Sequence, residues 1–261
     1  PTWGTHDDHG HGTLMAGTAA YGDLLDSIRN NRPLIVRHGL ESAKILPPPP
    51  EANPRRLWGH FTDQGVRLAE IQAPHRTRII CMAVTSEEEP TRGRPTSWSG
   101  QIDEMASGYS DDKKRLIILS AGNVNDPVDW KAYPDSNKTR EVHDPAHAWN
   151  ALTVGAFTTK TRITDATLIG FRAIAEAGGL SPFSSTSVAW ANRKWPIKPE
   201  VLFEGGNVAI GPNGNVFDTD DLKLLSTYHN PQVAQFAAFD ATSAGCAQAA
   251  WMAARIQAAY P

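Results

Sequence analysis

Cysteine is scarce in this chain, which has only Cys81 and Cys246 among its 261 residues. Two cysteines exclude a disulfide-rich scaffold. They do not exclude a single disulfide, although two free buried thiols are the commoner arrangement. Free thiols favour a reducing compartment, and the chain starts at Pro1 with no signal peptide in the sequence given. We expect the native N-terminus to lie elsewhere and leave the compartment open, leaning towards a cytoplasmic bacterial protein.

An excess of positive charge is also lacking. The chain has 25 Lys and Arg against 28 Asp and Glu, a formal net charge of −3. No basic surface therefore points to nucleic acid or to an anionic membrane. No long uncharged apolar run is present either, which argues against a transmembrane helix. With 40% hydrophobic and 20% charged residues, the composition is that of an ordinary globular protein.

Hydrophobic periodicity alternates between the spacings typical of helices and strands. Helices are expected at residues 12–22, 62–73, 97–108 and 242–260, and strands at residues 42–46, 78–85, 115–123 and 150–158. This alternation predicts an α/β fold with a mainly parallel sheet and helices on both faces. The proline-rich segment 45–56 indicates a stiff surface loop, with a proline-rich ligand motif as the less favoured alternative. Residues 160–240 are expected to form loops and short strands.

The segment HDDHGHG at residues 6–12 crowds histidines and aspartates before an Ala- and Gly-rich helix. His11 would open that helix. A metal site formed by residues 6–11 is an alternative, but the i, i+4 histidine spacing of a helical zinc motif is missing. Asp7 and Asp8 are better explained as a solvated turn.

Two other polar positions stand where function collects in α/β proteins. Asn123 ends the strand of residues 115–123, and the carboxyl ends of such strands commonly border the binding site. Ser243 opens the last helix, where free N–H groups and the positive helix end suit a developing oxyanion. Taken singly, Asn123 could be a turn residue, and Thr242, Ser243 or Asp240 a helix cap.

Taken together, these pieces resemble the subtilisin-like serine proteases (subtilases). The family motif H-G-T-x-x-A-G is matched from His11 to Gly17, and A-G-N is matched at residues 121–123. The serine motif G-T-S-x-A-x-P is matched at Thr242 and Ser243, but Ala241 replaces its glycine and Ala247 stands where its proline is usual. The resemblance spans nearly the whole chain and implies a three-layer α/β sandwich of the subtilisin type.

The resemblance also implies a role for each matched residue. Ser243 would attack the scissile carbonyl, His11 would act as general base and acid, and the Asn123 side chain would help to hold the oxyanion. The family's aspartate precedes the histidine in a D-[ST]-G context, which occurs nowhere in this sequence. We therefore expect residues 1–261 to be a single peptidase domain lacking the N-terminal strand with that aspartate, with further segments or domains upstream of Pro1.

Substrate contacts are carried over from the family in the same way. Ala83, Val84 and Thr85 would pair with an extended peptide. Ser120, Ala121 and Gly122 would wall the primary specificity pocket, where small residues leave room for a large apolar side chain. The partners implied are protein or peptide substrates. No cofactor is implied, and the structural calcium common in the family cannot be placed.

Several alternatives remain open. Cys246 lies three residues after Ser243 but is expected to face the core rather than act as nucleophile. His143 and His147 border an insert that could bind metal or gate the cleft, although a surface loop is favoured. The missing aspartate and the altered serine motif suggest a catalytically weakened scaffold or peptide-binding domain as the main alternative to an endopeptidase. A metal-dependent hydrolase using residues 6–11 is the other.

Overall fold

A computed structural model describes residues 4–86, 91–190 and 194–260. Its centre is a sheet in which four parallel strands lie in the order β1–β2–β3–β6. A short fifth strand, β5, pairs antiparallel with the end of β3. These strands are β1 Ile79–Met82, β2 Leu116–Ser120, β3 Leu152–Thr158, β5 Gly179–Leu180 and β6 Val201–Glu204.

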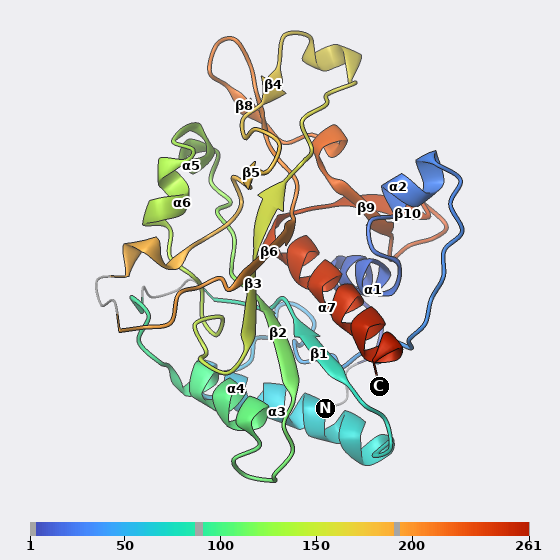
Figure 1. Ribbon diagram of the computed structural model, residues 1–261, viewed down its shortest axis with the longest axis vertical. Coiled ribbons are helices and arrows are strands. Elements are labelled where there is room, and N and C mark those ends of the chain that lie inside the picture. Colours follow the sequence, from blue (N-terminus) through green and yellow to red (C-terminus); the bar gives the residue numbers. More distant parts are fainter. Residues whose placement is uncertain (1–3, 87–90, 191–193, 261) are drawn as a thin grey trace.

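Helices cover both faces of this sheet (Figure 1). Helix α7 (Ala241–Ala259) packs on one face, with α1 (His11–Tyr21) beside it, and α3 (Trp58–Gln72) and α4 (Ser97–Ser107) lie on the other. This arrangement confirms the predicted α/β three-layer sandwich with a mainly parallel sheet.

Alternation along each strand explains why both faces are covered. In β2, Ile118 packs against the α7 side, whereas Ile117 and Leu119 pack against the α4 side. All three side chains are at most 1% exposed. A strand buried on both faces has a continuous apolar sequence, which is the pattern that predicted it.

The helices expected near residues 12–22, 62–73, 97–108 and 242–260 are confirmed, although α3 begins earlier, at Trp58. The strand predicted at residues 42–46 is wrong, because this segment forms no strand. It runs over α3, so close that a Cβ on Gly65 would lie 3.1 Å from Ile45. A helix offers no free backbone groups for pairing, so the apolar side chains pack there without a ladder.

Outside the sandwich, the chain forms loops and short elements, as predicted for residues 160–240. The short helices are α2 Leu24–Arg29, η1 Arg55–Leu57, α5 Pro127–Lys131, α6 Asp135–Thr139, η2 Ala166–Leu168, η3 Ser187–Ala189 and η4 Asp220–Leu222. The short strands are β4 Arg172–Ala173, β7 Ala209–Ile210, β8 Val216–Phe217, β9 Leu224–Thr227 and β10 Phe236–Phe239. Strand β9 pairs with β10, and β7 lies between β4 and β8.

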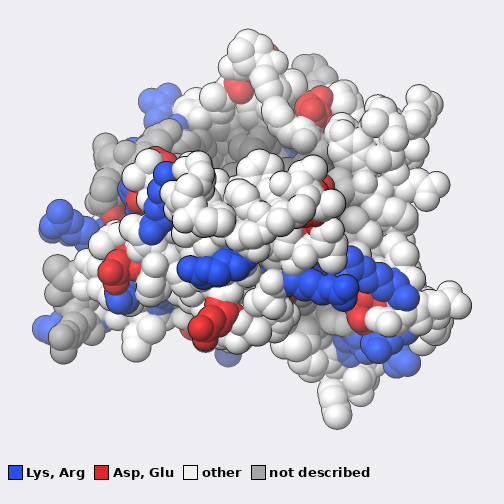
Figure 2. Space-filling model, turned by 90° about the horizontal axis from the view of Figure 1, so that it is seen from above, with Lys and Arg blue, Asp and Glu red and all other residues white. Residues whose placement is uncertain are grey.

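The surface carries charges of both signs. On the face shown in Figure 2, Lys and Arg side chains stand beside Asp and Glu side chains, with uncharged surface between them. Within the described part of the chain, no helix has the length and apolar character needed to cross a membrane.

Candidate active site

Helix α1 begins at His11, after a turn built on Asp7. The Asp7 carboxylate accepts hydrogen bonds from the N–H groups of His9, Gly10 and Thr13, the last at 2.7 Å, and from the Thr13 hydroxyl at 2.8 Å. It thereby satisfies an N–H of the first helical turn that has no partner within the helix. Partial burial raises the pKa of Asp7, but these hydrogen bonds outweigh it and the pKa is lowered overall. Asp7 is thus a turn-forming residue, as the sequence indicated.

The His11 side chain is exposed to solvent, and its ring lies edge-on to Phe239, with ring centroids 6.0 Å apart. Although the residue is exposed, protein groups surround part of its ring, and this partial loss of water lowers the pKa of His11. The negative charge of Asp7 opposes this effect. The imidazole is therefore biased towards its neutral form, which is the form that accepts a proton.

Asn123 lies just after β2 and contacts the start of α7. Its side-chain oxygen accepts a hydrogen bond from the Thr242 N–H at 3.0 Å and a second from the Thr242 hydroxyl. The same hydroxyl also donates to the Gly122 carbonyl at 3.2 Å. Because Thr242 occupies the oxygen of the Asn123 amide, the NH₂ group is the end left to face elsewhere.

Ser243 lies in the first turn of α7 and is 5% exposed. Two residues earlier, Ala241 adopts a left-handed backbone with φ of +62°. Glycine tolerates this conformation best, and Ala241 is the position where the serine motif normally has glycine. Asp240 occupies the N-cap position but makes no side-chain capping bond. Its carboxylate lies 3.0 Å from the Lys223 amine.

In the structure, Asn123 contacts Thr242, the residue before Ser243. His11 is connected to the start of α7 only through intervening residues. Helix α1 packs along α7, and Phe239, which contacts the His11 ring, lies just before α7 begins. Among the described residues, no hydrogen bond joins the His11 ring to the Ser243 hydroxyl, and no carboxylate hydrogen-bonds that ring.

The residues expected to bind substrate follow two adjacent strands. Ala83, Val84 and Thr85 come directly after β1, and Ser120, Ala121 and Gly122 are at and beyond the end of β2. The two strands pair in parallel, with Met82 opposite Leu119. Both segments therefore leave the sheet at the same edge.

A cavity of about 420 Å³ and another of about 400 Å³ hollow the surface. The cavity of about 400 Å³ is an apolar groove beside the expected substrate segment, which contributes Val84 and Thr85. Its wall also includes His9, Trp58, Phe61, Trp98 and much of the proline-rich segment 45–53. The sequence predicted that segment only as a loop, because which surface a loop lines depends on tertiary packing.

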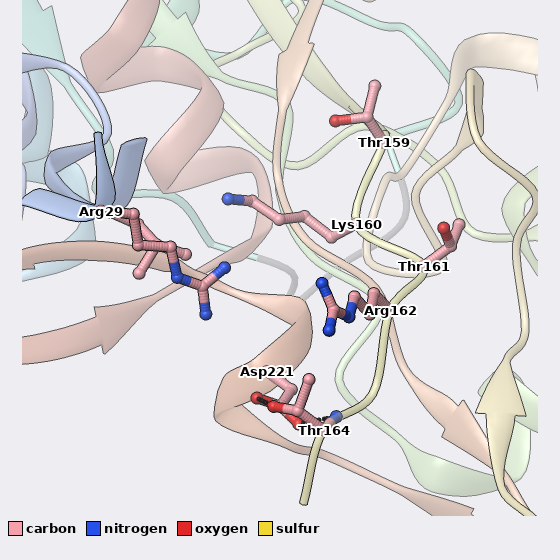
Figure 3. A pocket seen from close by; sticks show the side chains of 8 residues that line it. Arg29, Thr159, Lys160, Thr161, Arg162, Thr164 and Asp221 are labelled. Atoms are coloured by element: carbon pink, nitrogen blue, oxygen red, sulfur yellow. Dashed lines mark hydrogen bonds between the residues drawn. The ribbon is translucent and has the colours of Figure 1, made fainter. Parts of the chain in front are cut away.

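The cavity of about 420 Å³ (Figure 3) contains none of the predicted site residues. Arg29, Lys160 and Arg162 line it together with Asp221. The Lys160 amine pairs with Asp23 at 2.6 Å, and Asp221 accepts bonds from the Thr164–Asp165 turn.

The histidines and aspartates of residues 6–11 do not converge on one point. His6 lies 2.7 Å from Asp8, Asp8 pairs with Lys44 at 2.5 Å, and Asp7 binds backbone N–H groups. Across the part of the chain that the structure describes, no three His, Cys, Asp or Glu side chains are grouped to hold a metal ion.

Cys246 is fully buried, and its sulfur lies 3.5 Å from that of Cys81. Both thiols are free. Burial raises the pKa of Cys246 well above its ordinary value, so it is a poor thiolate nucleophile. It faces the interior, as the sequence predicted.

Comparisons with known proteins identify the family. The model of the subtilase family (Peptidase_S8) matches residues 2–261. No curated protein sequence matches the chain. Similar solved structures include a lanthipeptide protease (17% identity, TM-score 0.50), the psychrophilic protease S41 (21%, 0.56) and sphericase (18%, 0.56).

These matches cover 97%, 100% and 98% of this chain but only 62%, 69% and 66% of those proteins. At these identities, the matches to solved structures show only a shared fold. The family model matches nearly all residues, so the chain belongs to the subtilase family.

Proposed function

We propose that this chain is the peptidase domain of a serine endopeptidase that cleaves peptide bonds through an acyl-enzyme. Membership of the subtilase family implies a serine peptidase. The hydrogen bond from the Thr242 N–H to the Asn123 side chain supports this mechanism best. It connects the end of β2 to the start of α7 and so holds the Asn123 amide next to Ser243.

Each residue has a defined role in this proposal. The Ser243 hydroxyl attacks the scissile carbonyl, and the neutral His11 imidazole takes its proton and later donates it to the leaving amine. The Asn123 NH₂ group and the Ser243 N–H stabilise the oxyanion at the positive end of α7. The free hydrogen-bonding capacity of the Asn123 amide lies on its NH₂ side, which is the side that an oxyanion requires.

The orienting carboxylate of the triad is proposed to lie outside residues 1–261. Among the described residues, Asp7 is the one carboxylate whose charge acts on the His11 pKa. It already accepts four hydrogen bonds from His9, Gly10 and Thr13. A carboxylate that holds this turn is not available to orient the ring in the way a triad requires.

Peptide substrates fit the surface beside these residues. An extended peptide paired with Ala83–Thr85 would place alternate side chains on either side of its backbone. Those on one side meet the apolar groove, where Trp58, Phe61 and Trp98 offer aromatic contact. Such a groove recognises apolar side chains while backbone pairing tolerates many sequences.

Labelling of the full-length protein with a fluorophosphonate probe tests the proposal. We expect one label per chain, lost in Ser243→Ala and strongly reduced in His11→Ala. Ser107→Ala is the matched control, since Ser107 is exposed on α4, and it should label normally. Labelling that survives Ser243→Ala, or that never occurs in the wild type, would overturn the assignment.

A catalytically weakened, peptide-binding domain is the second candidate, favoured by Ala241 at the motif's glycine position with its φ of +62°. The same experiment separates the two functions. Peptide binding without any labelling would support the binding domain, whereas labelling with turnover would exclude it.

A further inference from the structure

Residues His143 and Asp144 lie between the two segments expected to bind the peptide. The His143 N–H donates to the Ala121 carbonyl at 2.9 Å. Asp144 and Ser86 exchange a pair of backbone hydrogen bonds at 2.8 and 3.0 Å. Ser86 directly follows Ala83–Thr85, so this short segment joins the ends of both walls of the primary pocket.

The His143 side chain lies directly on Gly122. A Cβ added to Gly122 would be 2.2 Å from Cγ and 2.5 Å from Nδ1 of His143, a distance that real Cβ atoms essentially never show. The φ of Gly122, +97°, also suits glycine. Glycine thus brings the bare backbone against the imidazole, and no other residue would leave space for the ring there.

His143 is more exposed to solvent than the neighbouring Asp144. His143 is partly exposed, whereas Asp144 is 7% exposed. The Asp144 carboxylate accepts a hydrogen bond from the Thr96 hydroxyl at 2.7 Å, at the start of α4. That bond directs the acid towards the helix layer and away from Gly122.

Gly122 connects the imidazole to the proposed nucleophile. Its carbonyl accepts the Thr242 hydroxyl, and Thr242 directly precedes Ser243. When Ser243 attacks the carbonyl of a substrate residue, the side chain of that substrate residue lies between Gly122 on one side and Ala83–Thr85 on the other. The His143 ring packs against the Gly122 side of that space.

We propose that His143 is a specificity-determining residue that shortens the primary pocket, so that the enzyme accepts a small side chain before the scissile bond. This inference rests on the proposed function. It replaces the expectation of a large apolar side chain, which followed from Ser120, Ala121 and Gly122 alone. An imidazole ring is only somewhat smaller than a phenyl ring, so in this proposal its volume leaves too little room for an aromatic substrate side chain.

The test compares two peptide p-nitroanilides that differ only in alanine or phenylalanine before the cleaved bond. For the full-length wild type, we expect kcat/KM to be at least about tenfold higher with alanine. His143→Ala should raise the value for phenylalanine by at least about tenfold and change that for alanine little. His143→Gln retains bulk and should keep the preference, and His75→Ala controls for loss of an exposed histidine elsewhere.

The outcomes separate this inference from the proposed function. A wild type that prefers phenylalanine, or a His143→Ala variant with an unchanged preference, would overturn the role of His143 while fluorophosphonate labelling of Ser243 stood. Absence of both labelling and cleavage would overturn the proposed function, and this inference with it. If His143→Ala fails to fold, the wild-type preference between alanine and phenylalanine decides.

Discussion

The Asn123 side-chain oxygen binds the backbone N–H of Thr242 at 3.0 Å, across 119 positions of sequence. This bond ties the end of the central strand β2 to the first turn of α7. It also determines the orientation of the Asn123 amide, because the oxygen is turned towards Thr242 and the NH₂ group is left for a ligand.

Replacing Asn123 by Ala should lower kcat by about a hundredfold or more with a smaller change in KM, because an oxyanion donor acts mainly in the transition state. A loss of this size is what removal of the equivalent asparagine causes in subtilisin. Steady-state kinetics on a peptide substrate checks it, and fluorophosphonate labelling should slow in parallel. An unchanged kcat in a folded Asn123→Ala variant would remove this residue from the site.

The His11 imidazole should titrate below the ordinary histidine value in the protein of residues 1–261. Loss of water around the ring lowers its pKa, and the carboxylate proposed to orient the ring lies outside these residues. An NMR titration of the ring should therefore give a pKa below the ordinary value of about 6.5. Asp7→Asn removes the opposing negative charge and should lower the pKa further. An upward shift in this variant would contradict the assignment.

Asp7→Ala should destabilise the protein by about 1 kcal/mol, the usual cost of losing a capping side chain. The folded-state pKa of Asp7 is lowered, so its contribution is fully present above the unfolded pKa of about 4. The contribution is lost as the pH falls through the folded value. Urea unfolding of both proteins at neutral pH and in acid tests this, and the difference should shrink in acid. The exposed His75→Ala variant, which leaves this turn intact, should show no such difference at either pH.

Ala241→Val should destabilise the fold by roughly 2 kcal/mol or more, because a β-branched residue in a left-handed conformation is strained. Ala241→Gly should differ from the wild type by less than about 1 kcal/mol. Relief of strain is offset there by the loss of a buried methyl group. Chemical denaturation distinguishes the two variants. Equal stability of the valine and glycine variants would show that the positive φ carries no cost.

Cys246→Ala should retain fluorophosphonate labelling, since the buried thiol has a raised pKa and faces Cys81. In the folded wild type, Cys246 should react slowly with a thiol reagent and become fully reactive on denaturation. Loss of labelling in a folded Cys246→Ala variant would assign this thiol a catalytic role.

Local sequence patterns predicted the elements of the fold, because their physical causes are local. The apolar run of β2 is buried from Ile117 onwards, and the Ala-rich α7 is buried over its first half, where it packs on the sheet. The prediction for residues 42–46 failed because a short apolar run does not reveal whether its neighbour will be a strand or a helix. Only packing on α3 settled that segment as irregular.

For the candidate site, the sequence determined which residue types occur and in what order, since H-G-T, A-G-N and T-S are contiguous motifs that can be read directly. Their spatial relations depended on the tertiary structure. The contact of Thr242 with Asn123, the approach of Cys246 to Cys81 and the position of His143 on Gly122 each join residues from separate motifs. Such contacts arise when the parallel strands assemble and bring their carboxyl ends to one edge, which no local pattern encodes.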